Sequence, residues 1–106
     1  MTIFSLLQRL ELGDNKLEEL PESIVLLGNL QHLLADSNRI ASLPSPFVFE
    51  KLVSLSAKNN RLTELPASFK ECWELEVLNL TGNPLKSSFW YLVSQLPKLR
   101  ELSPQP

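Results

Sequence analysis

The sequence contains very few of the residues that build metal sites and disulfide frameworks. Of its 106 residues, 1 is a cysteine and 1 is a histidine. Neither an intrachain disulfide nor a zinc ligand set can be assembled from them, and a reducing compartment is favoured. The 3 glycines, Gly13, Gly28 and Gly82, stand far apart, which excludes a glycine-rich phosphate-binding loop. The sequence therefore predicts no metal and no cofactor.

Neither charge nor hydrophobic patterning favours nucleic acid or a membrane as a direct partner. The formal net charge is −2, so the chain lacks the basic footprint of a nucleic-acid-binding protein. No apolar run reaches the roughly 18 residues of a membrane span, and residues 1–7 lack the basic start of a secretory signal. We expect a soluble, cytoplasmic protein that does not insert into membranes.

One pattern occurs four times along the chain. Each copy reads L-x-x-L-x-[LA]-x-x-N, and its closing asparagines lie 23, 22 and 23 residues apart. A period of about 20–29 residues with this spacing is typical of leucine-rich repeats. We therefore predict an α/β fold, a right-handed horseshoe solenoid with a parallel concave sheet and short helical or irregular convex segments. The expected organisation is a single domain, residues 1–106, with repeats at about 7–29, 30–51, 52–74 and 75–98.

Alternation along each short strand divides its side chains between two faces. The leucines and alanines of the pattern face the core, and the residues between them form an exposed concave face. Its mixed charge suits a protein partner. The predicted protein-binding residues are Arg9, Glu11, His32, Leu34, Asp36, Ser54, Ser56, Lys58, Asn79 and Thr81.

The repeated asparagines are expected to have a structural role. An asparagine side chain can satisfy backbone groups where the chain turns off a strand, and equivalent residues in successive repeats would form a ladder. The predicted ladder consists of Asn15, Asn38, Asn60 and Asn83.

Three copies continue into a leucine–proline pair, at Pro21, Pro44 and Pro66, which predicts a turn into a short helix on the convex side. The second copy also contains Pro46, so an irregular segment is expected there. Over roughly residues 7–75, this L-x-x-L-P pattern resembles the intracellular Ras-group leucine-rich repeat proteins, typified by Ras-suppressor and Ras-Raf scaffold proteins. The resemblance implies a scaffold that binds proteins in small-GTPase-linked signalling.

The pattern changes in the last copy. Residues 86–103 contain Phe89, Trp90 and Tyr91, then a leucine–proline pair and two further leucines. This segment resembles the C-terminal cap of phosphatase-regulator and spliceosomal A-prime repeat proteins, except that Ser103 replaces the aspartate usual there. We expect the three aromatic residues to form the cap core, although not all of them can point inward.

No equivalent cap is visible at the N-terminal edge, where only Ile3, Phe4 and Leu6 precede the first strand at about Leu7. An uncovered repeat edge is prone to pair with other chains. We expect either self-association through this edge or an upstream segment that covers it.

The concave face also carries residue types that occur in catalytic sites. His32 and Ser54 occupy one column on neighbouring strands, with Asp36 nearby in the sequence. Asp36 lies roughly 13 Å along the strand from His32, at about 3.3 Å per residue, too far to orient the imidazole as in a serine-hydrolase triad. The sequence therefore predicts a protein that is not an enzyme. His32 is expected to be a solvated contact residue, with a pH-sensing role as the alternative.

We expect different environments for two neighbouring residues that precede the fourth strand. Cys72 takes the place of Leu27 in the first copy and is predicted to fill the core. Trp73 takes the place of Gly28 and is expected to pack against its neighbours, the alternative being an exposed anchor for a partner.

The function predicted from these features is that of an adaptor or scaffold. The alternatives are a regulatory subunit that modulates a phosphatase or GTPase and a structural fragment of a longer repeat array.

Overall fold

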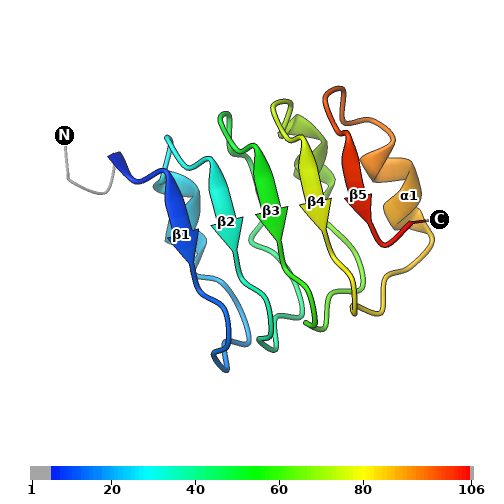
Figure 1. The fold of residues 1–106 in the computed structure, drawn as a ribbon, viewed down its shortest axis with the longest axis horizontal. Coiled ribbons are helices and arrows are strands. Elements are labelled where there is room, and N and C mark those ends of the chain that lie inside the picture. Colours follow the sequence, from blue (N-terminus) through cyan, green and yellow to red (C-terminus); the bar gives the residue numbers. More distant parts are fainter. Residues whose placement is uncertain (1–5, 106) are drawn as a thin grey trace.

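The computed structural model describes residues 6–105, which form one parallel sheet with return segments behind it (Figure 1). The strands lie side by side in chain order, and each pairs in register with the next because the repeats have nearly equal lengths. This confirms the predicted repeat solenoid. The strands are β1 (Arg9–Glu11), β2 (His32–Leu34), β3 (Ser54–Ser56), β4 (Val77–Asn79) and β5 (Glu101–Ser103).

Strand β5 goes beyond the four strands expected from the repeats. Leu102 of β5 pairs with Leu78 of β4, so the cap ends by adding a strand to the sheet. The signal in the sequence was the pair Leu99 and Leu102, which continues the L-x-x-L spacing without a closing asparagine.

The convex side carries short helices in the first and third repeats and at the cap. Two 3₁₀ helices, η2 (Glu22–Leu26) and η3 (Ala67–Glu71), start directly after Pro21 and Pro66, and the α-helix α1 is Ser88–Val93. Each proline carbonyl accepts the first bond of its helix, from Ile24 N at 3.0 Å and from Phe69 N at 2.9 Å.

In the second repeat the return segment has no helix among the described residues, as its two prolines predict. Pro44 and Pro46 supply no N–H donors, which removes the bonds that a helical turn would need. The neighbouring repeat compensates, because Phe47 N donates to Ser68 Oγ at 2.7 Å.

The core lies between the sheet and the return segments. Leu33, Leu55 and Leu78, at the strand centres, are almost completely buried. Behind them Phe47 stacks on Phe69 with ring centroids 5.5 Å apart. Such aromatic contacts between neighbouring repeats are the interfaces that stabilise a solenoid.

A left-handed residue ends each of the four strand–turn units. Asp14, Ser37 and Asn59 have φ near +60°, and Gly82 has φ of +82°. A Cβ on Gly82 would lie 2.2 Å from Asn59 Oδ1, so that glycine meets both a conformational and a spatial requirement.

The cap buries only some of its aromatic residues. Phe89 is buried and Trp90 contacts it edge-on at 4.9 Å, but Tyr91 is 75% exposed, so its expected place in the cap core was wrong. Tyr91 comes two positions after Phe89, which places it about 200° around a helix of 3.6 residues per turn and therefore on the face opposite the core. At the N-terminal edge, the expectation concerning Ile3 and Phe4 falls outside the described residues.

Among residues 6–105, no helix is long and apolar enough to cross a membrane.

Candidate protein-binding surface

The strand register brings the predicted concave residues into three columns. Pairing places Arg9, His32, Ser54 and Val77 in one column and Glu11, Leu34, Ser56 and Asn79 in the next. The third column, just beyond the strands, contains Gly13, Asp36, Lys58 and Thr81. Backbone bonds of 2.8–2.9 Å to the carbonyls of its last three members continue the register there.

The columns extend further than the sequence indicated. Glu101 and Ser103 of β5 align with Val77 and Asn79. They were missed because β5 itself was missed.

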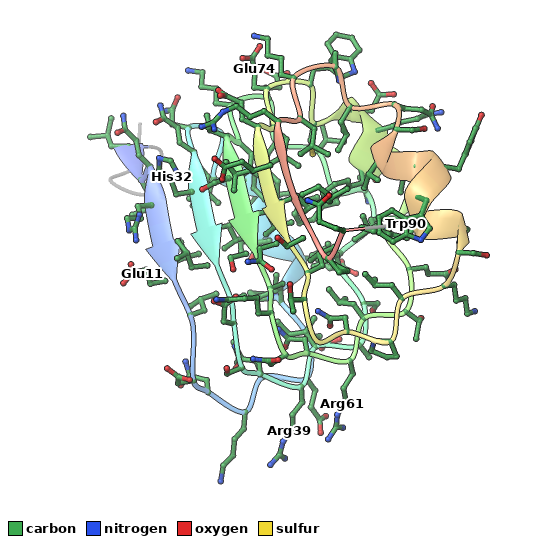
Figure 2. The ribbon with its side chains drawn as sticks, turned by 45° about the vertical axis from the view of Figure 1, so that its right-hand side comes forward. Glu11, His32, Arg39, Arg61, Glu74 and Trp90 are labelled. Atoms are coloured by element: carbon green, nitrogen blue, oxygen red, sulfur yellow. The ribbon has the colours of Figure 1, made fainter. Side chains whose placement is uncertain are left out.

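A histidine–serine pair lies on the concave face. His32 Nδ1 and Ser54 Oγ are 2.7 Å apart, which joins β2 to β3. Figure 2 labels His32 beside β2. Asp36 does not complete a triad, because its Oδ1 accepts hydrogen bonds from Ser56 Oγ at 2.7 Å and Lys58 N at 2.8 Å. Within residues 6–105 no carboxylate is hydrogen-bonded to His32, so the pair lacks the group that would orient the imidazole in a triad.

Asp36 makes several contacts across this surface. Besides those two hydrogen bonds, its Oδ2 lies 3.9 Å from Lys58 Nζ, and both side chains are partly exposed. The bond to the Lys58 amide ties the turn after β2 to the turn after β3. Asp36 therefore stabilises the surface as well as contributing charge to it.

Ion pairs border the surface at both ends. On β1, Arg9 and Glu11 form a pair at 2.6 Å. Beside β5, Arg100 contacts Glu76 at 2.9 Å and Glu101 at 2.8 Å, and hydrogen bonding to Glu76 raises the pKa of Arg100. All of these side chains are exposed to solvent, so their net contribution to stability is small.

The asparagine ladder underlies the surface and is built from buried and partly buried hydrogen bonds. Oδ1 of each of Asn38, Asn60 and Asn83 accepts the amide of a residue in the preceding repeat, at 2.9–3.1 Å. Their Nδ2 atoms donate to strand-end carbonyls of their own and the preceding repeat. Asn15 differs, because it bonds only to the carbonyls of Leu12 and Gly13 in its own turn.

The two residues before the fourth strand differ in exposure. Cys72 is fully buried, confirming its role in the core, and burial is the main reason that the pKa of its thiol is raised. Trp73 is 61% exposed, so the expectation that it packs against its neighbours was wrong. Phe49 and Phe69 are buried in the core and leave the indole uncovered.

No group of three or more histidine, cysteine, aspartate or glutamate residues in the described part of the chain could hold a metal ion. The concave surface carries polar side chains around the half-buried Leu34.

Comparison with known proteins agrees with this geometry. The leucine-rich repeat family model matches residues 74–96. A solved structure of a Leptospira interrogans leucine-rich repeat protein superposes with a TM-score of 0.83 and 34% identity, covering 91% of this chain and 25% of that one. The chain is a leucine-rich repeat protein.

Two further relatives are a chain of a solved complex and a much longer phosphatase. The Drosophila melanogaster SNF/U2A' complex contains a chain with a TM-score of 0.71 and 27% identity, covering 91% of this chain and 59% of that one. The MAP kinase phosphatase with leucine-rich repeats protein 1 of Dictyostelium discoideum is 34% identical over 79 residues, which are 73% of this leucine-rich repeat chain. The chain spans 10% of the length of that phosphatase.

Proposed function

We propose that this leucine-rich repeat protein is an adaptor that binds a protein partner through its concave face in the cytoplasm. The observation that carries the proposal is the network of hydrogen bonds that joins neighbouring strands on that face. His32 is held by Ser54, and Asp36 is held by Ser56 and by the Lys58 amide. Side chains that are already ordered lose little entropy on binding, so the surface is preorganised for recognition.

The known relatives support a protein partner. Leucine-rich repeats generally mediate protein–protein interactions, and solenoids present extended concave binding surfaces. The structural relative from Drosophila melanogaster was solved as a complex. Five strands of three residues make a small surface, so we expect an affinity at the weak end of specific complexes.

The proposal is tested by affinity capture from a soluble lysate with three baits of equal folding, verified by circular dichroism. The wild-type chain is compared with Lys58→Glu on the concave face and Lys70→Glu on η3. The two variants carry the same charge change, and neither removes the bond between Asp36 and the backbone amide of residue 58.

We expect Lys58→Glu to lose a protein that wild type and Lys70→Glu both retain. Equal capture by all three baits, or a loss confined to Lys70→Glu, would contradict the concave site.

A second role is regulation of an enzyme, in which the partner is a phosphatase or a small GTPase. It is supported by the Dictyostelium discoideum relative, whose name joins leucine-rich repeats to a MAP kinase phosphatase in one chain. The experiment is to measure the turnover of a captured phosphatase or GTPase with and without this chain. A changed rate indicates regulation, whereas unchanged turnover with retained binding indicates an adaptor.

We also propose that β1 supports self-association or continuation of the array. Within the described residues β1 pairs on one side only, with β2, and the nearby Leu6 is 61% exposed. Sedimentation equilibrium over a range of concentrations tests this, with Leu6→Lys as the variant. A monomer at every concentration would remove the self-association proposal.

A further inference from the structure

An exposed tryptophan borders a depression on the edge of the solenoid where the strands begin. The depression has a volume of about 360 Å³ and is lined by Val48, Glu50, Glu71, Trp73 and Glu74. It joins the second repeat to the third and is separate from the concave surface. Figure 2 shows Glu74 at this edge, far from the turns that carry Arg39 and Arg61.

Local structure forces both apolar side chains outward. Val48 lies between Phe47 and Phe49, which are both buried, so it is left 37% exposed. Trp73 follows the buried Cys72, and its backbone N–H closes the turn after η3 by donating to Glu71 O at 2.9 Å. The result is an apolar wall that the fold itself does not cover.

Three carboxylates surround this wall. Glu74 pairs with Lys98 at 2.8 Å, in a contact where both side chains are about half exposed. Glu50 and Glu71 form no ion pair with any other residue in the 6–105 range. The depression therefore combines an accessible aromatic face with two carboxylates that form no ion pair.

This combination selects one ligand chemistry. A guanidinium group stacks on an indole face and makes paired hydrogen bonds with carboxylates, whereas an anionic group would be repelled. We propose that the Trp73 depression is a docking site for an arginine side chain of a partner protein. It would act as a second contact point beyond the concave surface. Arginine is favoured over lysine because its planar guanidinium group both stacks on the indole and makes paired hydrogen bonds with carboxylates.

The test uses a capped arginine–glycine pentapeptide and the same peptide with citrulline in place of arginine. Citrulline keeps the planar shape and removes the charge. The chain has 2 tryptophans, so a proton–nitrogen spectrum contains two indole N–H signals. Trp90, which is half-buried in the cap, serves as the internal reference for Trp73.

We expect the arginine peptide to shift the Trp73 indole signal in a saturable way and to leave Trp90 unchanged. The citrulline peptide should bind markedly more weakly, and added salt should weaken only the arginine peptide.

Two variants separate the contributions. Trp73→Leu removes the aromatic face and should weaken the binding of the arginine peptide by about 2- to 5-fold, measured by fluorescence anisotropy of a labelled peptide. The double variant Glu50→Gln, Glu71→Gln keeps the indole and should make the arginine and citrulline peptides bind alike. Both changes are at exposed positions and should leave the circular dichroism spectrum intact.

Three results would overturn the proposal: no shift of the Trp73 signal, equal shifts with both peptides, or shifts centred on strand amides instead. Because the peptide test needs no concave-face partner, its outcome is independent of the proposed adaptor function.

Discussion

Replacing Asn60 by alanine should destabilise the chain far more than replacing Asn15, although both residues close the same repeat pattern. Asn60 makes four hydrogen bonds, one through Oδ1 and three through Nδ2. Its Oδ1 is the acceptor for the amide of Ile40, a residue with no exposed surface. The change therefore leaves one buried N–H without a partner.

The three carbonyls that accept hydrogen bonds from Asn60 Nδ2 keep other donors in the variant. Ala35 O still accepts from Asn38, Ala57 O from Asn83, and Lys58 O from the Ser37 amide. One unsatisfied buried donor costs about 1–3 kcal/mol, and three weakened acceptors add to it. We expect Asn60→Ala to lower the free energy of unfolding by about 2–3 kcal/mol and Tm by roughly 10–20 °C.

Asn15→Ala is the matched control. It removes two exposed bonds within its own turn, and Leu12 O keeps its bond from Asn38. The expected loss is below about 1 kcal/mol. Urea unfolding followed by circular dichroism measures both variants. Equal losses for the two would show that the inter-repeat bond to Ile40 does not carry the stabilisation.

Three further changes test other parts of the account. Ser37→Asn should raise the free energy of unfolding by about 0.5 kcal/mol in urea titrations, because asparagine tolerates the left-handed conformation better; a loss would contradict this. Gly82→Ala should lower it by at least about 1–2 kcal/mol, since the new Cβ meets Asn59 Oδ1 and φ is positive; unchanged stability would refute the strain. Burial raises the pKa of Cys72, so the folded state keeps its proton above the ordinary value of 9.0. The stability of wild type relative to Cys72→Ala should therefore be constant below pH 9 and fall as the pH rises above it; a difference independent of pH through that range would contradict this.

The parts of the fold that could be predicted from sequence are those encoded by a repeating local pattern. Leu33, Leu55 and Leu78 recur at one spacing, so their inward orientation and the strand register follow from the period. The irregular return segment of the second repeat could also be predicted, because its two prolines act on the local backbone.

The features that were missed depend on neighbours distant in sequence. Strand β5 keeps only the spacing of Leu99 and Leu102, and its pairing with β4 requires the path of the cap helix. Whether Trp73 is covered depends on where the preceding return segment lies, which places Val48 beside it rather than an aromatic ring.

The positions of the candidate surface residues could be predicted from the sequence, but the hydrogen bonds among them could not. Alternation along the strands was enough to place the concave residues in columns. It could not show that Asp36 bonds to Ser56 and to the Lys58 amide, because this depends on side-chain rotamers and on the turn after each strand. The network therefore gives Asp36, which was predicted as a contact residue, a structural part in the surface.

The most direct test of the central claim is site-specific photo-crosslinking in a soluble lysate. A benzophenone amino acid is placed at Leu34 on the concave face or at Ser23 of η2 on the convex side, in separate samples. The account predicts a discrete crosslinked protein from position 34 and none from position 23. Crosslinking from position 23 alone, or the same product from both positions, would contradict recognition through the concave sheet.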